Sequence, residues 1–75
     1  MSQEDRQFKD RIYEHLGRIG KALSCPKRLE LLDLLAQGPR TVEVLSREAG
    51  LNLANASKHL QILRAARLVD AEKRG

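Results

Sequence analysis

The sequence predicts a small, mainly α-helical domain of four helices followed by a short strand, and three observations favour this fold class. Apolar residues make up 41% of the 75 residues but aromatic residues only 3%, so the core must be built from aliphatic side chains. The leucines recur three and four residues apart, which is the periodicity of an amphipathic helix. Strand-forming residues are scarce. A chain of this length forms one domain at most, so we assign residues 1–75 to a single domain.

The first predicted helix covers Gln3 to Leu23 and carries one apolar stripe. Because the three later helices already complete a small core, we expect this stripe to contact a second copy of the chain. The alternative is that the whole stripe packs within its own chain. The residues predicted at the interface of a homodimer are Phe8, Ile12, Leu16 and Ile19.

The second predicted helix runs from Pro26 to the pair Gly38 and Pro39. Proline is tolerated at the first helical position because its missing N–H would have no partner there. A glycine followed by a proline ends a helix. The leucines expected on the inner face are Leu29, Leu32 and Leu35, with Leu31 and Leu34 widening the stripe.

A short third helix and a longer fourth helix are predicted on either side of a turn at Gly50 and Leu51. Thr41 and Asn52 are the expected N-caps, because their side chains can accept hydrogen bonds from backbone N–H groups of the first turn. The fourth helix is predicted to reach about Arg67. The residues expected to face the core are Val42, Leu45, Ala49, Ala56, Leu60 and Leu63. This is the helix-turn-helix plan, in which the second helix enters the major groove of DNA.

The outer face of the fourth helix has the chemistry of a base-reading surface. Between Ala49 and Val69 the sequence holds no acidic residue, and the net charge of the chain is +4, which favours a polyanionic partner. Short side chains permit a close approach to DNA, and amide or hydroxyl groups can form hydrogen bonds with base edges. The residues predicted to contact double-stranded DNA are Asn52, Ala54, Asn55, Ser57, Lys58, Gln61, Arg64, Arg67, Lys73 and Arg74.

Residues 68–73 are predicted to form a strand that leads into a turn at residues 74–75. A helix-turn-helix followed by a strand and a basic turn is typical of a winged helix. The predicted fold is therefore a winged helix-turn-helix DNA-binding domain with four helices and an incomplete wing. The alternative is a helical protein-interaction module without DNA binding, which would not require a fourth helix that is free of acidic residues.

Residues 19–75 closely resemble the ArsR/SmtB family of bacterial repressors. The matching segments are residues 21–29 (KALSCPKRL), 50–52 (GLN), 57–60 (SKHL), Leu63 and residues 68–69. Residues 18–23 and 54–57 are most similar to members that are fused to a rhodanese-like sulfurtransferase domain. The resemblance implies a dimeric repressor that binds an inverted-repeat operator and is released by a small inducer or by a redox or sulfur signal. It also implies that the domain is truncated before the second wing strand and the last helix of the family.

No metal site, cofactor or catalytic centre is expected. Many metal-sensing members of the family carry a Cys-x-Cys pair where this sequence has Thr41 and Glu43, so the thiolate ligands for a soft metal are missing. Neither His15 nor His59 has the spacing of a metal motif, and His59 is expected to be packed or to face phosphate. No nucleophile, base and orienting group form a set, so an enzyme is not expected.

Cys25 is a candidate redox residue. It is the one cysteine of the chain, and it is expected at the N-cap of the second helix beside Lys27 and Arg28, surroundings that lower the pKa of a thiol. The alternative is a half-buried structural residue at a bend. The chain shows no signal peptide and no apolar run long enough to span a bilayer, so we expect a cytoplasmic protein without a membrane partner.

Overall fold

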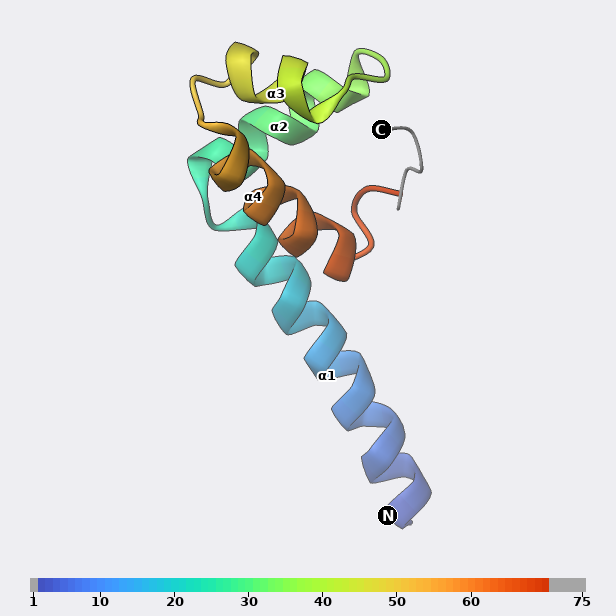
Figure 1. Cartoon of the computed structure of the whole chain (residues 1–75). Helices are drawn as coiled ribbons and strands as arrows, with labels where there is room; N and C mark the ends of the chain where they lie inside the picture. Colours follow the sequence, from blue (N-terminus) through green and yellow to red (C-terminus); the bar gives the residue numbers. More distant parts are fainter. Residues whose placement is uncertain (1, 71–75) are drawn as a thin grey trace.

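The computed structural model describes residues 2–70, whose regular structure consists of four helices. The helices are α1 (Gln3–Leu23), α2 (Pro26–Ala36), α3 (Val42–Glu48) and α4 (Leu53–Ala65). Figure 1 shows α2, α3 and α4 grouped at one end, while α1 extends away from them with the N-terminus at its far end. We call residues 3–18 of α1 the arm. Because of the arm, the molecule measures 50 × 24 × 22 Å.

Three of the four helices begin at a side chain that caps them, as the sequence predicts for α3 and α4. The capping oxygens of Ser2, Thr41 and Asn52 accept hydrogen bonds from the backbone N–H three residues later, at 3.1, 3.2 and 2.7 Å. At the start of α2, Pro26 follows the N-cap Cys25, whose side chain makes no capping hydrogen bond. The predicted bounds of α1 are confirmed, and so is the start of α2.

The core lies where the last turns of α1 pack against α2 and α4, with α3 packed against α4. Its buried side chains are Ala22, Leu31, Leu45, Ala49, Leu60, Leu63 and Ala66. The inner faces predicted for α3 and α4 are confirmed, with Ala56 also buried and Val42 packed at the edge. The face predicted for α2 is wrong at Leu29, which is 48% exposed, while Leu31 is fully buried. The helix is rotated because Arg28 occupies the buried side of its first turn.

The turn between α3 and α4 depends on the left-handed conformation of Gly50. Its φ is +69°, and its N–H donates to the carbonyl of Arg47 at 3.3 Å. The next N–H, of Leu51, donates to the carbonyl of Ser46 at 2.8 Å. These two bonds form a Schellman motif, which satisfies the free carbonyls at the end of α3. A glycine fits this position because it lacks the Cβ that disfavours positive φ.

The C-terminal end of α4 has the same pair of bonds, but an arginine takes the place of the glycine. The N–H of Arg67 donates to Arg64 at 2.9 Å and that of Leu68 donates to Leu63 at 3.0 Å, while Arg67 has a φ of +60°. The helix therefore ends at Ala65, two residues before the predicted end.

The strand predicted for residues 68–73 is not formed by the residues that the structure describes. Residues 68–70 have no strand conformation, and Leu68 and Val69 instead pack against the edge of the core. A strand needs a neighbouring strand to pair its N–H and C=O groups, and residues 2–70 contain none. Residues 71–73 and the predicted turn at residues 74–75 lie outside the described residues.

Candidate nucleic-acid interface

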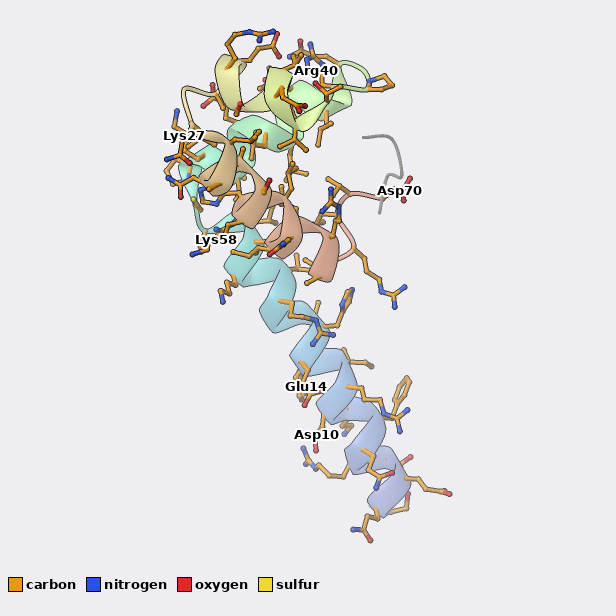
Figure 2. All side chains as sticks on the ribbon, in the orientation of Figure 1. Asp10, Glu14, Lys27, Arg40, Lys58 and Asp70 are labelled. Carbon is orange, nitrogen blue, oxygen red and sulfur yellow. The ribbon has the colours of Figure 1, made fainter. Side chains whose placement is uncertain are left out.

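The side of α4 that faces away from the core is a continuous exposed surface. Ala54, Lys58 and Gln61 are exposed and Ser57 is half-buried. Their spacing of three and four residues places them on one ridge of the helix. Asn55 is exposed beside this ridge. Figure 2 shows Lys58 pointing away from the group of helices.

The predicted DNA-contacting residues fall at both ends of this surface. Asn52 lies at the start of α4, where its Oδ1 is used for the cap. Arg64 is half-buried in the last turn, and Arg67 is exposed just beyond the helix. Helix α4 contains no acidic residue, so the surface is positively charged. The predicted contacts Lys73 and Arg74 lie outside the described residues.

Replacing Arg67 by glycine is expected to stabilise the fold while weakening DNA binding. Glycine has no Cβ, so it removes the steric cost of the positive φ at this position. This gain is larger than the entropy that a glycine loses on folding, so the free energy of unfolding should rise by up to about 1 kcal/mol. The lost positive charge should lower affinity for all duplexes alike. Urea denaturation followed by circular dichroism measures the stability, and fluorescence anisotropy measures the affinity for DNA.

Gly50→Ala is the matched control for this prediction. It should destabilise the fold, because the φ of Gly50 is also positive. Loss of stability in both variants would contradict this account.

A polar contact on the inner side of α4 was missed by the sequence analysis. The Arg28 side chain is 8% exposed and donates from Nε to the carbonyl of Ala22 at 3.0 Å and from Nη2 to that of Lys21 at 2.8 Å. Its Nη1 lies 3.1 Å from Nδ1 of His59. Because arginine can only donate, His59 accepts through Nδ1. The one available signal was an arginine three residues before a core leucine.

His59 is a packed residue, one of the two alternatives that the sequence left open. Burial lowers the pKa of its imidazole, and the positive charges of Arg28 and Lys58 lower it further. The lowered pKa favours the neutral ring, which is the form that can accept a hydrogen bond. Within residues 2–70 no group of three or more His, Cys, Asp or Glu side chains is placed to hold a metal ion.

The Cys25 thiol is half-buried at the start of α2. Its pKa lies below the ordinary value, chiefly because the backbone N–H of Arg28 favours the thiolate; burial opposes this, and the N–H of Lys27 and the charge of Arg28 add to it. The predicted direction is confirmed, but the main cause is the helix backbone rather than the basic side chains. The redox role of Cys25 stays a prediction.

The arm leaves most of its apolar stripe uncovered. Phe8, Ile12 and Leu16 are 64, 40 and 55% exposed, and we call these three residues the arm stripe. The alternative that the whole stripe packs within its own chain is therefore wrong. Ile19, the fourth predicted interface residue, packs partly against its own core. None of the described helices has the length and apolar character needed to cross a membrane.

Two helices joined by a tight glycine turn, with a basic and exposed second helix, define a protein of the helix-turn-helix class. Comparison with known proteins narrows this class to one family. The family model described as "Bacterial regulatory protein, arsR family" matches residues 25–71, which include α2, α3 and α4. The chain belongs to the arsR family.

Named relatives agree with this assignment. The chain is 45% identical over 73 residues to the HTH-type transcriptional regulator Rv0324 of Mycobacterium tuberculosis, covering 97% of this chain and 31% of the relative. It is 37% identical over 65 residues to the uncharacterized HTH-type transcriptional regulator MT0088 of the same species, covering 85% of this chain and 57% of the relative. The chain thus spans about a third to a little over half of the length of these relatives.

Two solved structures from Mycobacterium bovis share the fold. One is the crystal structure of a possible transcriptional regulatory protein (fragment 1–100), which has 45% identity and a TM-score of 0.80 and covers 85% of this chain and 69% of that chain. The other is the solution NMR structure of the homodimeric winged helix-turn-helix DNA-binding domain Mb0332 (fragment 1–100), described as a possible ArsR-family transcriptional regulator. It has 41% identity and a TM-score of 0.85 and covers 100% of this chain and 66% of that chain.

Proposed function

We propose that this chain is the DNA-binding part of a transcriptional repressor that binds double-stranded DNA as a homodimer, with α4 in the major groove. The observation that carries the proposal is the outer face of α4, which is exposed, free of acidic residues and made of short polar and basic side chains. The homodimeric winged helix-turn-helix DNA-binding domain to which the chain is 41% identical supports it.

The residues of α4 divide into two roles under this proposal. Short and polar side chains at the start of the helix read base edges, whereas basic side chains contact phosphates and so set the position of the protein without reading sequence. The base-reading set is Ala54, Asn55, Ser57 and Gln61, and Lys58 on the same ridge contacts nearby phosphates. The phosphate-contacting set is Asn52, Arg64, Arg67, Lys73 and Arg74.

The dimer would form through the arm stripe together with Ile19. Two copies of α4 would then lie about 34 Å apart, in successive major grooves on one face of an inverted-repeat operator. An inducer, or a redox or sulfur signal, would lower operator affinity by favouring a dimer geometry that does not match this spacing. The redox role of Cys25, the kinship with rhodanese-fused members and the cytoplasmic location are part of this proposal.

Salt dependence separates DNA binding from the alternative, a helical protein-interaction module. Lys58, Arg64, Arg67, Lys73 and Arg74 from two protomers would neutralise about ten phosphates, so log K should fall against log salt with a slope of about −9. The measurement is fluorescence anisotropy with a labelled 30-base-pair duplex of random sequence between about 50 and 300 mM salt. Absence of duplex binding at the lowest salt, or binding that salt does not change, would exclude the proposal.

A further inference from the structure

We infer that Arg28 is a positioning residue that fixes the orientation of the recognition helix α4 relative to the arm, acting through His59. This inference rests on the proposed function, because α4 must enter the major groove for its orientation to affect the reading of bases. It adds to that function a buried group of hydrogen bonds that would set the relative orientation of the two α4 helices in a dimer.

Arg28 connects three elements through one rigid group. Arg28 lies in α2. Two of its hydrogen bonds go to carbonyls in the last turn of α1, and the third goes to His59 on α4. The carbonyl of Ala22 lies at the helix end, where it has no partner within the helix, so the guanidinium satisfies a buried group there. The carbonyl of Lys21 also accepts from the N–H and Oγ of Ser24. The planar fork of arginine fixes the angles between its donors, which a lysine ammonium cannot do.

Few apolar side chains of α1 are buried against the rest of the described chain. Within α1 only Ala22 is buried, and Ile19 packs at the edge of the core. The arm is about 24 Å long at 1.5 Å per residue, so a rotation of about 10° at its base displaces its far end by about 4 Å. If two arms are paired in a dimer, the same rotation displaces each α4 against the groove that it must enter.

His59 is well placed to transmit this constraint. It directly follows Ser57 and Lys58 in α4, and those residues belong to the outer face while the His59 ring turns inward to Arg28. Burial lowers the pKa of the ring, and the positive charges of Arg28 and Lys58 lower it further, which favours the neutral form that can accept. This hydrogen bond on the inner side of α4 thus acts together with the buried Leu60 and Leu63 to fix the rotation of the side that would read bases.

The first test measures orientation without DNA. Spin labels are placed at Glu14→Cys on the arm and Ala65→Cys on α4, two exposed positions, in a Cys25→Ser background, because Cys25 makes no capping bond. Labelled chains are diluted tenfold with unlabelled chains, so that double electron–electron resonance reports the distance within one chain. His59→Leu removes the acceptor and should broaden the distance distribution, whereas His59→Asn presents an oxygen near the place of Nδ1 and should keep it narrow.

The second test measures sequence discrimination with a duplex selected from a random pool by the wild-type chain. His59→Leu should lower the ratio of selected to random duplex affinity by about tenfold, within the range of coupling between sites, and His59→Asn should preserve the ratio. Arg28→Lys should also lower it. Arg40→Lys is the matched control, since Arg40 donates to the carbonyls of Leu34 and Gly38 and to the carboxylate of Glu48, none of which lies in α4. It should leave the ratio unchanged.

The outcomes separate this inference from the proposed function. A His59→Leu chain that keeps a narrow distance distribution and an unchanged affinity ratio overturns the inference, even when the wild-type chain binds DNA. A wild-type chain that binds no duplex overturns the proposed function instead, and the distance distributions then still decide whether Arg28 positions α4.

Discussion

Replacing Leu16 by aspartate is expected to convert the dimer into monomers and to lower affinity for a two-half-site operator by about a hundredfold or more. Leu16 is 55% exposed and lies within the arm stripe, so an aspartate there would place a carboxylate in an apolar interface. Burying a leucine contributes about 1.5–3 kcal/mol, and burying an unpaired charge is strongly unfavourable. Sedimentation velocity measures the mass, and titration of a duplex with two half-sites measures the affinity.

Gly17→Asp is the matched control for this prediction. It introduces the same charge one residue away, about 100° around the helix, where a Cβ would meet nothing within 4 Å. Asp10 and Glu14, which lie on this side of α1, show that the face already carries carboxylates (Figure 2). Gly17→Asp should therefore remain dimeric. A dimer of unchanged strength in Leu16→Asp would show that the arm stripe is not the interface.

Substitutions on α4 are also expected to have large effects on DNA binding. The kind of effect should depend on the role of the residue that is replaced. Lys58→Ala should weaken binding to every duplex alike and reduce the salt slope by about 1 for each phosphate that the protein no longer neutralises. Asn55→Ala and Ser57→Ala should instead relax discrimination between the selected duplex and its single-base variants by about 1–3 kcal/mol, a factor of roughly five to a hundred and fifty. Competition titrations at several salt concentrations measure both quantities.

Arg11→Ala is the control for the removal of a positive charge, because Arg11 is exposed on the arm rather than on α4. It should leave both the salt slope and the discrimination unchanged. Equal reductions of affinity on all duplexes from Lys58→Ala, Asn55→Ala and Ser57→Ala would show that α4 attracts DNA without reading its bases.

Local signals in the sequence were sufficient to place the helices. The N-caps Thr41 and Asn52 and the turn residue Gly50 act within a few residues, so their effects can be predicted without knowing the rest of the fold. The predicted end of α4 was two residues too late, because Arg67 adopts a left-handed conformation that arginine rarely takes. Nothing in the local sequence marks that position as a helix end.

The errors concern contacts between elements that are distant in the sequence. Leu29 was expected in the core because of its spacing with Leu32 and Leu35, but the rotation of α2 is set by Arg28 and its acceptors on α1 and α4. Burying an unpaired charge is strongly unfavourable, so the burial of an arginine can be predicted only when its hydrogen-bond partners are known. The strand at residues 68–70 likewise depended on a pairing partner that periodicity cannot supply.

The shape of α1 has a consequence for how the regulator would respond to its own abundance. Most of the stability of a helix in a protein comes from packing, and the arm stripe is uncovered within its own chain, so in the proposed dimer the arm would gain stability from the second copy. The fraction of folded arms then increases together with the fraction of paired chains and the occupancy of the operator. Where most chains are unpaired and the operator is far from saturated, dimer concentration follows the square of chain concentration, so halving expression should lower operator occupancy about fourfold. Small changes in synthesis would thus act as a threshold for repression.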